Sequence, residues 1–219
     1  SAARPFPRWK PSASRRPSSS LRTAAASACA SEPVYTLVLN GSPRPGGDTD
    51  ALCEAFARSV RGRAETVRAY GADVSPCLDC RACRRTPGCR VHDGMDEIYA
   101  RIDRADVLVI ASPVFFSQLS GPLLSLLSRL QCRYLDRTLR SAPPRNALGV
   151  VLLAAGGAGS VEPALAGAKS VFAALGVRFL GYALAGHTDL TPAARDNDAL
   201  ARARALGLLA REEALASPP

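Results

Sequence analysis

Several features that would assign this chain to a well-known class are scarce or missing. Only two histidines occur among the 219 residues, His92 and His187, which leaves little room for a histidine-rich metal site. No apolar run approaches the ~18 residues that span a bilayer, so we expect no transmembrane helix and no membrane partner. The G-x-S-x-G turn that presents the nucleophile of many serine hydrolases is absent, which argues against that class. No apolar segment of a secretory signal follows the basic start.

Acidic side chains are absent from the first 31 positions. Residues 1–31 carry six basic side chains and are otherwise rich in Ser, Ala and Pro, without apolar periodicity. Such a segment cannot bury enough apolar surface to offset the entropy lost on ordering, so the sequence predicts a disordered basic extension. A composition rich in Arg and Ser and free of acid is also typical of an organellar transit peptide. An unstructured tail, or upstream sequence outside the working protein, explains the same composition equally well.

The remaining residues, 32–219, are nearly neutral and are predicted to form one domain. They hold 22 basic and 19 acidic side chains, so only +3 of the formal charge of +9 belongs to them. The length fits one domain at ~150 residues per domain. Because these residues offer no basic face and no aromatic stacking pattern, we expect no nucleic-acid partner. We predict a soluble intracellular protein, plastid or mitochondrial if residues 1–31 are a transit peptide and cytoplasmic otherwise.

Short β-rich runs alternate with longer helical patterns along this domain. The predicted strands are 34–39, 64–70, 106–111, 147–154 and 177–184. The predicted helices are 49–61, 95–102, 123–130, 161–175 and 193–216. Five strands alternating with five helices predict right-handed βαβ crossovers and a parallel sheet covered on both faces, which is an α/β fold.

The loop after the first predicted strand has the composition of a phosphate site. In such sheets the ligand lies beyond the carboxyl ends of the strands. Here residues 40–49 read NGSPRPGGDT and lead into a helix. Glycine-turn N–H groups, hydroxyls, an arginine and a helix N-terminus together suit an anion such as phosphate. The loop matches neither the P-loop nor the G-x-G-x-x-G fingerprint. The plainer interpretation is a flexible turn in which Asp48 caps the helix.

Three loops in the same order resemble the NADPH-dependent FMN reductase family, which has a flavodoxin-like fold. NGSPRPGGDT is similar to the family's NGSPR-x-x-GNT phosphate loop. Residues 105–116 resemble the family segment beside the flavin ring, and residues 154–159 resemble its third flavin-contacting loop. The similarity covers roughly residues 34–185. It implies a flavodoxin-like, doubly wound, five-stranded parallel sheet of order 2-1-3-4-5, with helices on both faces.

This resemblance implies FMN as a cofactor. The residues that would bind it are Ser42, Arg44, Asp48 and Thr49 around the phosphate, and Pro113, Val114, Phe115, Phe116, Gly156, Gly157 and Gly159 around the isoalloxazine. The sequence departs from the family where Asp48 replaces the usual Asn, which brings a carboxylate near a dianionic phosphate. Such repulsion weakens binding unless Asp48 points away or Arg44 compensates. Further departures are Phe115 for Tyr, Leu124 for Lys, and Ser128 for the Asp that precedes Arg129.

Four of the seven cysteines are concentrated in one short loop. Their spacing is C-x₂-C-x₂-C-x₅-C, formed by Cys77, Cys80, Cys83 and Cys89. It approaches the bacterial ferredoxin run, although the last gap is longer and no Pro follows. An odd total with one dense cluster argues against a secreted disulfide framework and favours a metal or redox site. We interpret Cys53 and Cys132 as core thiols.

The cysteine loop, residues 77–89, follows the second predicted strand and in that position resembles the iron–sulfur flavoproteins. These proteins belong to the same family and carry a [4Fe–4S] cluster alongside FMN. The resemblance implies a [4Fe–4S] cluster as a second cofactor, with the four clustered cysteines as its ligands. Zinc, a redox disulfide and a vestigial loop are the alternatives. Four arginines nearby would offset the negative charge of a thiolate-ligated cluster and raise its reduction potential, namely Arg81, Arg84, Arg85 and Arg90.

The sequence as a whole predicts a flavin-dependent oxidoreductase or electron-transfer protein that uses FMN and a [4Fe–4S] cluster. The chemistry would be carried by the cofactors, with no catalytic side chain. The expected partners are ferredoxin or NAD(P)H as electron donor, an unidentified acceptor, and further copies of the chain in a homodimer or higher oligomer. His92 and Asp93 are interpreted as a turn and helix cap, and His187 receives no role.

Two alternative functions remain open at this point. A cluster-free NAD(P)H-dependent FMN or quinone reductase would use the flavin alone. A non-enzymatic metal-binding module would use the flavodoxin-like scaffold without flavin, because the carboxylate of Asp48 would have abolished flavin binding.

Overall fold

The computed structural model describes residues 33–216, so the expectations for residues 1–31 lie outside the described residues. The elements along the chain are β1 (Tyr35–Asn40), α1 (Asp48–Val60), β2 (Arg63–Arg68), α2 (Ala82–Arg85), α3 (Met95–Arg104), β3 (Val107–Phe115), β4 (Gln118–Leu119), α4 (Gly121–Ser128), α5 (Gln131–Arg140), β5 (Leu148–Ala154), α6 (Glu162–Leu175), β6 (Arg178–Ala185), the 3₁₀ turn η1 (Ala193–Arg195) and α7 (Asn197–Ala216).

Five parallel strands form the body of the sheet, in the order β2-β1-β3-β5-β6. Since β5 and β6 are the fourth and fifth long strands, this is the predicted order, and the α/β flavodoxin-like prediction is confirmed. A sixth strand, β4, was not predicted. It pairs antiparallel with the end of β3, where Val114 lies opposite Leu119. Two residues carry no periodicity, so their pairing depends on the turn that folds them back.

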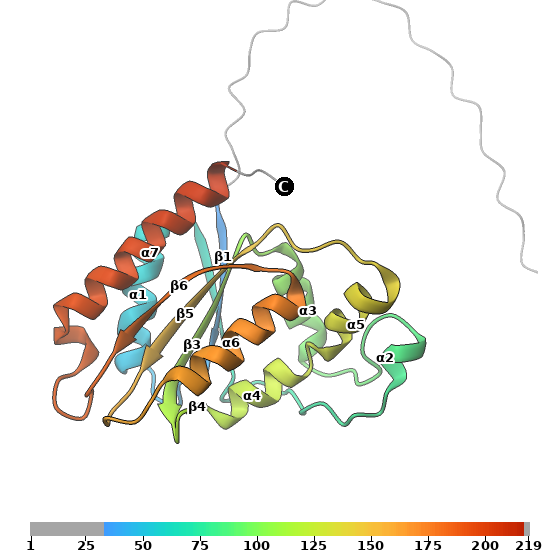
Figure 1. Ribbon diagram of the computed structural model, residues 1–219, viewed down its shortest axis with the longest axis horizontal. Helices are drawn as coiled ribbons and strands as arrows, with labels where there is room; N and C mark the ends of the chain where they lie inside the picture. The colour runs from blue at the N-terminus through green and yellow to red at the C-terminus, as the bar shows by residue number, and fades with distance from the viewer. Residues whose placement is uncertain (1–32, 217–219) are drawn as a thin grey trace, which may run out of the picture. The chain divides into compact units, whose positions relative to one another are not determined.

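Helices cover both faces of the sheet, and the side chains of each strand alternate between them. Val38 of β1 belongs to the apolar cluster shared with α1 and α7, whereas Leu37 belongs to the cluster shared with α3, α4 and α6. Figure 1 shows α1 and α7 on one side of the sheet and α3 and α6 on the other. Helix α7 approaches α1 closely at Gly207, where a Cβ atom would lie 2.5 Å from the Phe56 carbonyl oxygen. This contact joins the first helix to the last.

The observed helices differ from the predicted ones in three places. Helix α5 was missed because it buries only Cys132 and Leu135, too few residues for an apolar stripe. Helix α2 is a single short turn inside the cysteine loop. The last predicted helix is broken, because η1 ends at Arg195 and α7 begins only at Asn197. Within residues 33–216, no helix combines the length and apolarity needed to cross a membrane.

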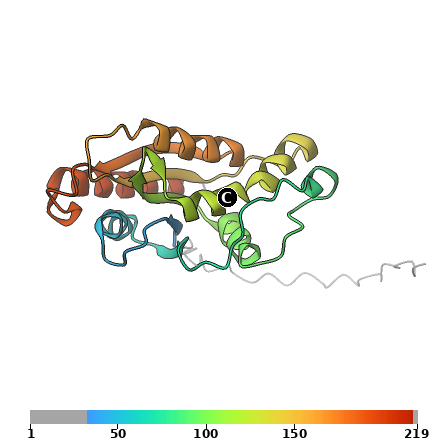
Figure 2. The same cartoon turned by 90° about the horizontal axis from the view of Figure 1, so that it is seen from below.

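The segment that carries the clustered cysteines leaves the sheet after β2. It includes α2 and returns to α3, at the end of the domain away from α7 (Figures 1 and 2). The carboxyl ends of the strands and the cysteine segment are therefore two separate places for chemistry.

Candidate functional site

The loop between β1 and α1 bends around a buried carboxylate that the sequence analysis did not single out. Asp50 Oδ1 accepts a hydrogen bond from Asn40 Nδ2 at 2.7 Å, and Asp50 Oδ2 accepts one from the Gly46 N–H at 2.7 Å. Asn40 Oδ1 in turn accepts from the Ser42 N–H at 2.8 Å. Asp50 therefore fixes the loop near both ends. An acidic residue in the first turn of a helix is usually explained by the helix dipole, so its sequence position gave no sign of this role.

A cation from the neighbouring strand holds Asp50 in its charged form. Arg68 of β2 donates to Asp50 through Nη2 at 2.7 Å and through Nη1 at 3.3 Å. Burial raises the pKa of Asp50, but hydrogen bonds from Arg68, Gly46 and Asn40 outweigh it, and the pKa lies below its usual value. The loop is therefore braced by an ionised carboxylate at neutral pH.

The Asp48 carboxylate is engaged outside the loop. Helix α1 begins at Asp48, so the N-cap position belongs to Gly47, and the interpretation of Asp48 as the cap is wrong. Asp48 Oδ1 accepts a hydrogen bond from the Ala193 N–H at 2.8 Å. The first bond of the helix runs from the Ala51 N–H to the Gly47 carbonyl. Residues 48–50 therefore have backbone N–H groups without a partner inside the helix, as an anion site at a helix N-terminus requires.

A cavity of about 250 Å³ gathers the predicted loops at the carboxyl ends of the strands. Nine of the eleven predicted FMN-binding residues line it: Ser42, Arg44, Asp48, Thr49, Pro113, Val114, Phe115, Gly156 and Gly157. The segment after β1 contributes the hydroxyls of Ser42 and Thr49, and β3 contributes the side chains of Pro113 and Val114. This arrangement fits a molecule with an anionic end and a flat apolar end, as FMN has.

The two remaining predicted residues, Phe116 and Gly159, do not line this cavity. Phe116 is fully exposed at the turn between β3 and β4. Both residues of the turn have positive φ, +50° at Phe116 and +63° at Ser117, a conformation that is costly without glycine. A Cβ atom on Gly159 would lie 3.9 Å from Ser117 Oγ, so Gly159 lies against this turn.

Five lining residues were not among those predicted: Pro43, Gly47 and Ala154 lie in loops that the sequence identified, whereas Thr188 and Asp189 lie in a loop after β6 that it did not. The Thr188 N–H donates to the Ala155 carbonyl at 3.0 Å, which draws this loop over the turn after β5. A Cβ atom on Gly156 would lie 2.5 Å from both carboxylate oxygens of Asp189, so the Asp189 side chain lies directly against Gly156. No motif marks this loop, because its position depends on the packing of two strands that are distant in sequence.

The four clustered cysteines line a second cavity, of about 90 Å³. All four thiols are free, and those of Cys77 and Cys80 are exposed. Cys132 lines the same cavity, although only 2% of it is exposed and it had been interpreted as a core thiol. Among the described residues, no three Cys, His, Asp or Glu side chains are close enough to hold one metal ion. In a four-iron cluster each thiolate binds a different iron, so its ligands need not converge on one point.

A buried guanidinium forms one wall of the cysteine cavity. Arg129 donates through Nη1 to the Ser75 carbonyl at 2.9 Å and to Asp93 Oδ2 at 2.6 Å, and through Nη2 to the Val91 carbonyl at 2.7 Å. Its Nε is also buried and has no acceptor in the described part of the chain. Four free thiols and an unused buried donor around one cavity fit a thiolate-ligated, negatively charged group.

The neighbouring His92 and Asp93 have different partners, and the N-cap position of α3 belongs to Gly94, so Asp93 lies one residue before the cap position. His92 Nδ1 lies 3.0 Å from Asp96 Oδ2, whereas Asp93 Oδ1 accepts from the Met95 N–H at 3.0 Å at the start of α3. Burial raises the pKa of Asp93, but the hydrogen bond from Arg129 and two backbone N–H groups bring it below its usual value.

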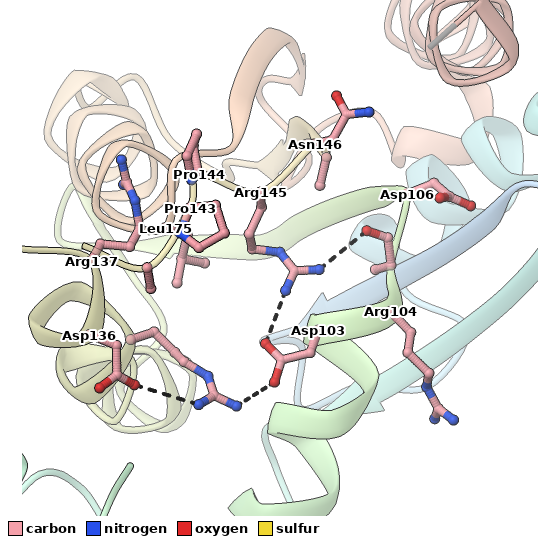
Figure 3. A pocket seen from close by; sticks show the side chains of 14 residues that line it. Asp103, Arg104, Asp106, Asp136, Arg137, Pro143, Pro144, Arg145, Asn146 and Leu175 are labelled. Carbon is pink, nitrogen blue, oxygen red and sulfur yellow. Dashed lines mark hydrogen bonds and ion pairs between the residues drawn. The ribbon is translucent and has the colours of Figure 1, made fainter. Parts of the chain in front are cut away.

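A larger cavity, of about 460 Å³, lies at the opposite ends of the strands. Figure 3 shows Arg145 pointing at Asp103, and the Nη1–Oδ1 distance is 3.0 Å. Arg133 also pairs with Asp103, and Arg137 donates to the Ala173 carbonyl at 2.8 Å. These bonds connect α3, α5 and α6, so the polar groups of this cavity are used to hold the domain together.

Comparison with known proteins relates the chain to flavin enzymes. The family model for NADPH-dependent FMN reductase matches residues 34–189. An iron-sulfur flavoprotein of Methanosarcina thermophila is 33% identical over 94 residues, 42% of this chain and 49% of that protein. The chain thus spans about half the length of this relative and of a second iron-sulfur flavoprotein, from Methanocaldococcus jannaschii. A putative NAD(P)H-dependent FMN-containing oxidoreductase of Bacillus subtilis is 28% identical over 184 residues, 81% of this chain and 98% of that protein.

Solved structures share the fold. An NAD(P)H:quinone oxidoreductase from Methanothermobacter marburgensis superposes with a TM-score of 0.62 at 19% identity, covering 80% of this chain and 96% of that one. An FMN-dependent NADH-azoreductase from Bacillus anthracis gives a TM-score of 0.59 at 18% identity, covering 84% and 100%.

Proposed function

Because the chain belongs to the NADPH-dependent FMN reductase family, we propose that it is a flavin-dependent oxidoreductase whose cysteine loop carries a [4Fe–4S] cluster. The observation that carries the proposal is the second cavity, which is lined by four free thiols and by Arg129, whose buried Nε has no acceptor in residues 33–216. The likeness to iron-sulfur flavoproteins supports it, since they are 33% and 30% identical over 94 residues.

The cleft at the carboxyl ends of the strands would hold FMN. Ser42 and Thr49 would bind the phosphate through their hydroxyls, the first N–H groups of α1 would donate to it, and Arg44 would supply positive charge. Pro113 and Val114 would lie against the isoalloxazine and exclude water from it. Bound FMN supplies the exchange of one or two electrons, while the protein contributes binding, orientation and charge.

The cysteine loop would hold the cluster through the thiolates of Cys77, Cys80, Cys83 and Cys89. The cationic side chains that line the same cavity, Arg81, Arg84 and Arg90, would offset its negative charge. In this scheme the donor is NAD(P)H or ferredoxin, the acceptor is a further redox partner, and the working protein is a homodimer or higher oligomer.

A cluster-free NAD(P)H-dependent FMN or quinone reductase is the second candidate. It is favoured by the Bacillus subtilis relative, whose likeness extends over 81% of this chain. A metal-binding module without flavin is supported less well, because it leaves the cleft lined by nine predicted FMN-binding residues without a purpose.

Counting the cofactors tests the proposal. Anaerobically purified protein is expected to contain FMN together with iron and acid-labile sulfide, at about four of each per flavin. Cys83→Ser should lose the iron and keep the FMN, because the two cavities are separate. The matched control is Cys53→Ser, whose thiol is buried in α1, and it should keep both cofactors. Flavin without iron in the wild-type protein would overturn the cluster and favour the second candidate. Iron without flavin would favour the metal-binding module.

A further inference from the structure

Arg129 is a buried cation that takes no part in the flavin cleft. Its side chain is 0% exposed, although it follows α4 at a short connection to α5. Burying a guanidinium is costly unless its charge is paired and its N–H groups are bonded. The side chain is paired with Asp93 and bonded to two backbone carbonyls.

Those groups lie on both sides of the cysteine loop. Ser75 stands two residues before Cys77, and Val91 stands two residues after Cys89. Because Arg129 donates to the carbonyls of both, one side chain joins the beginning of the loop to its end. Its ion-pair partner Asp93 strengthens the junction, since Asp93 Oδ2 also accepts from the Ser75 N–H at 3.1 Å.

The backbone of Arg129 is fixed as well. Its carbonyl oxygen accepts from the Tyr99 hydroxyl at 2.7 Å and from Cys132 Sγ at 3.4 Å. The side chain therefore leaves an anchored residue, and its direction is set before any cofactor binds.

Arg129 has five N–H donors and uses three of them, and its side chain lines the cysteine cavity. The Nε–H is buried and has no acceptor in residues 33–216. Burial lowers the pKa of Arg129, but Asp93 and then Cys89 raise it above its usual value, as expected for a sulfur beside the guanidinium. A buried N–H next to a thiol acquires a strong acceptor when that thiol becomes an anionic ligand.

We propose that Arg129 is a positioning residue of the cysteine loop, which fastens the two ends of the loop together and donates one of its unused N–H groups to the Cys89 sulfur when that sulfur binds the cluster. The second half of this statement rests on the proposed function. A hydrogen bond to a ligating sulfur stabilises the more negative, reduced cluster and so raises its reduction potential.

The fastening is tested on cluster-free protein. Arg129→Lys keeps the positive charge for Asp93 but replaces the planar donor fork with a single ammonium, which cannot reach both carbonyls and the sulfur. The matched control is Arg84→Lys, which makes the same change at an exposed residue of the same cavity. Trypsin cuts after the arginines of the loop and after lysine, so cleavage sites are equal in number. Cleavage within residues 77–90 should be several-fold faster in Arg129→Lys than in wild type or in Arg84→Lys, while FMN binding is retained.

The donated hydrogen bond is tested on cluster-loaded protein by a redox titration followed by electron paramagnetic resonance. In Arg129→Lys the ratio of reduced to oxidised cluster at a fixed potential should fall about tenfold, which is about 59 mV for a one-electron couple. The control for the potential is Arg58→Lys, which makes the same change at an exposed arginine of α1 and should leave the potential unchanged. Asp93→Asn keeps Arg129 but removes its counter-charge, so it should not lower the potential, although it should speed tryptic cleavage.

The outcomes separate this inference from the proposed function. Equal tryptic rates in wild type and Arg129→Lys overturn the fastening. A loaded Arg129→Lys protein with the wild-type potential overturns the hydrogen bond while the cluster itself stands. A wild-type protein without iron overturns the cluster and the hydrogen bond together, and the tryptic comparison still decides the fastening. If Arg129→Lys also loses FMN, Asp93→Asn takes its place in the tryptic comparison.

Discussion

The guanidinium of Arg68, at the end of β2, forms an ion pair with the carboxylate of Asp50 in the first turn of α1, with Nη2 and Oδ2 2.7 Å apart. This pair joins the edge strand to the loop that would receive the FMN phosphate. Because Asp50 also accepts from Asn40 and Gly46, the loop keeps its shape through groups that do not themselves face the ligand.

Asp50→Asn should loosen this loop and destabilise the domain. An amide cannot form an ion pair with Arg68, and one of the two acceptor atoms becomes a donor, so we expect a loss of about 1–3 kcal/mol at neutral pH. Urea unfolding measures this loss, with the exposed Asp198→Asn as control. Little change in Asp50→Asn would show that the brace contributes nothing to stability.

The same pair predicts how stability depends on pH. The pKa of Asp50 is lower in the folded protein than its unfolded value of about 3.9, so its contribution is complete above that value. It is lost as the pH falls through the folded pKa. The difference between wild type and Asp50→Asn should therefore be constant near neutrality and shrink in acid below pH ~4. A difference independent of pH would contradict this account.

Asp48→Asn should tighten FMN binding. An asparagine Oδ1 can still accept from the Ala193 N–H, so the contact remains while the negative charge is removed. Two charges at 4 Å in water repel by about 1 kcal/mol, which corresponds to about a fivefold change in affinity. Quenching of FMN fluorescence measures the affinity, with Asp198→Asn as the control for net charge. An unchanged affinity would mean that the carboxylate, held toward Ala193, lies out of range of the phosphate.

Cys53 should resist alkylation in the native protein. Burial, and then the negative charge of Asp50, raise the pKa of its thiol to about 12, so almost no reactive thiolate exists near neutral pH. Iodoacetamide followed by mass spectrometry should label the exposed Cys77 and Cys80 in cluster-free protein and spare Cys53 until urea unfolds the chain. Labelling of Cys53 at the rate of Cys77 would place it at the surface.

Phe116→Gly should make the protein slightly more stable. The positive φ of Phe116 is costly for a residue with a side chain and is natural for glycine, so we expect a gain of about 0.5–1 kcal/mol. Ser117→Gly is the matched variant, because its φ is also positive and no aromatic ring is lost. If the ring covers bound FMN, only Phe116→Gly will weaken FMN binding. A loss of stability in both variants would contradict the claim that the positive φ angles at Phe116 and Ser117 strain the backbone.

Local patterns were enough to predict much of the fold and part of the site. The strands are continuous apolar runs, and the phosphate loop and the clustered cysteines are contiguous in sequence, so spacing and composition identify them. Asp50, Asp189 and the unused N–H of Arg129 could not be predicted in this way. Each acquires its role from a partner brought near by folding: Arg68 of β2, the backbone of Gly156, and the two ends of the cysteine loop.

The hydrogen bond from the Ala193 N–H to Asp48, together with the packing of α7 on α1, has a consequence for the order of events during protein synthesis. Ala193, which supports the phosphate loop through this bond, is translated 145 residues after Asp48. Chains grow from the N-terminus and segments fold as they emerge. A ribosome must therefore have translated beyond residue 193 before the flavin cleft can be completed, so we expect FMN to be acquired by nearly finished chains rather than by nascent ones.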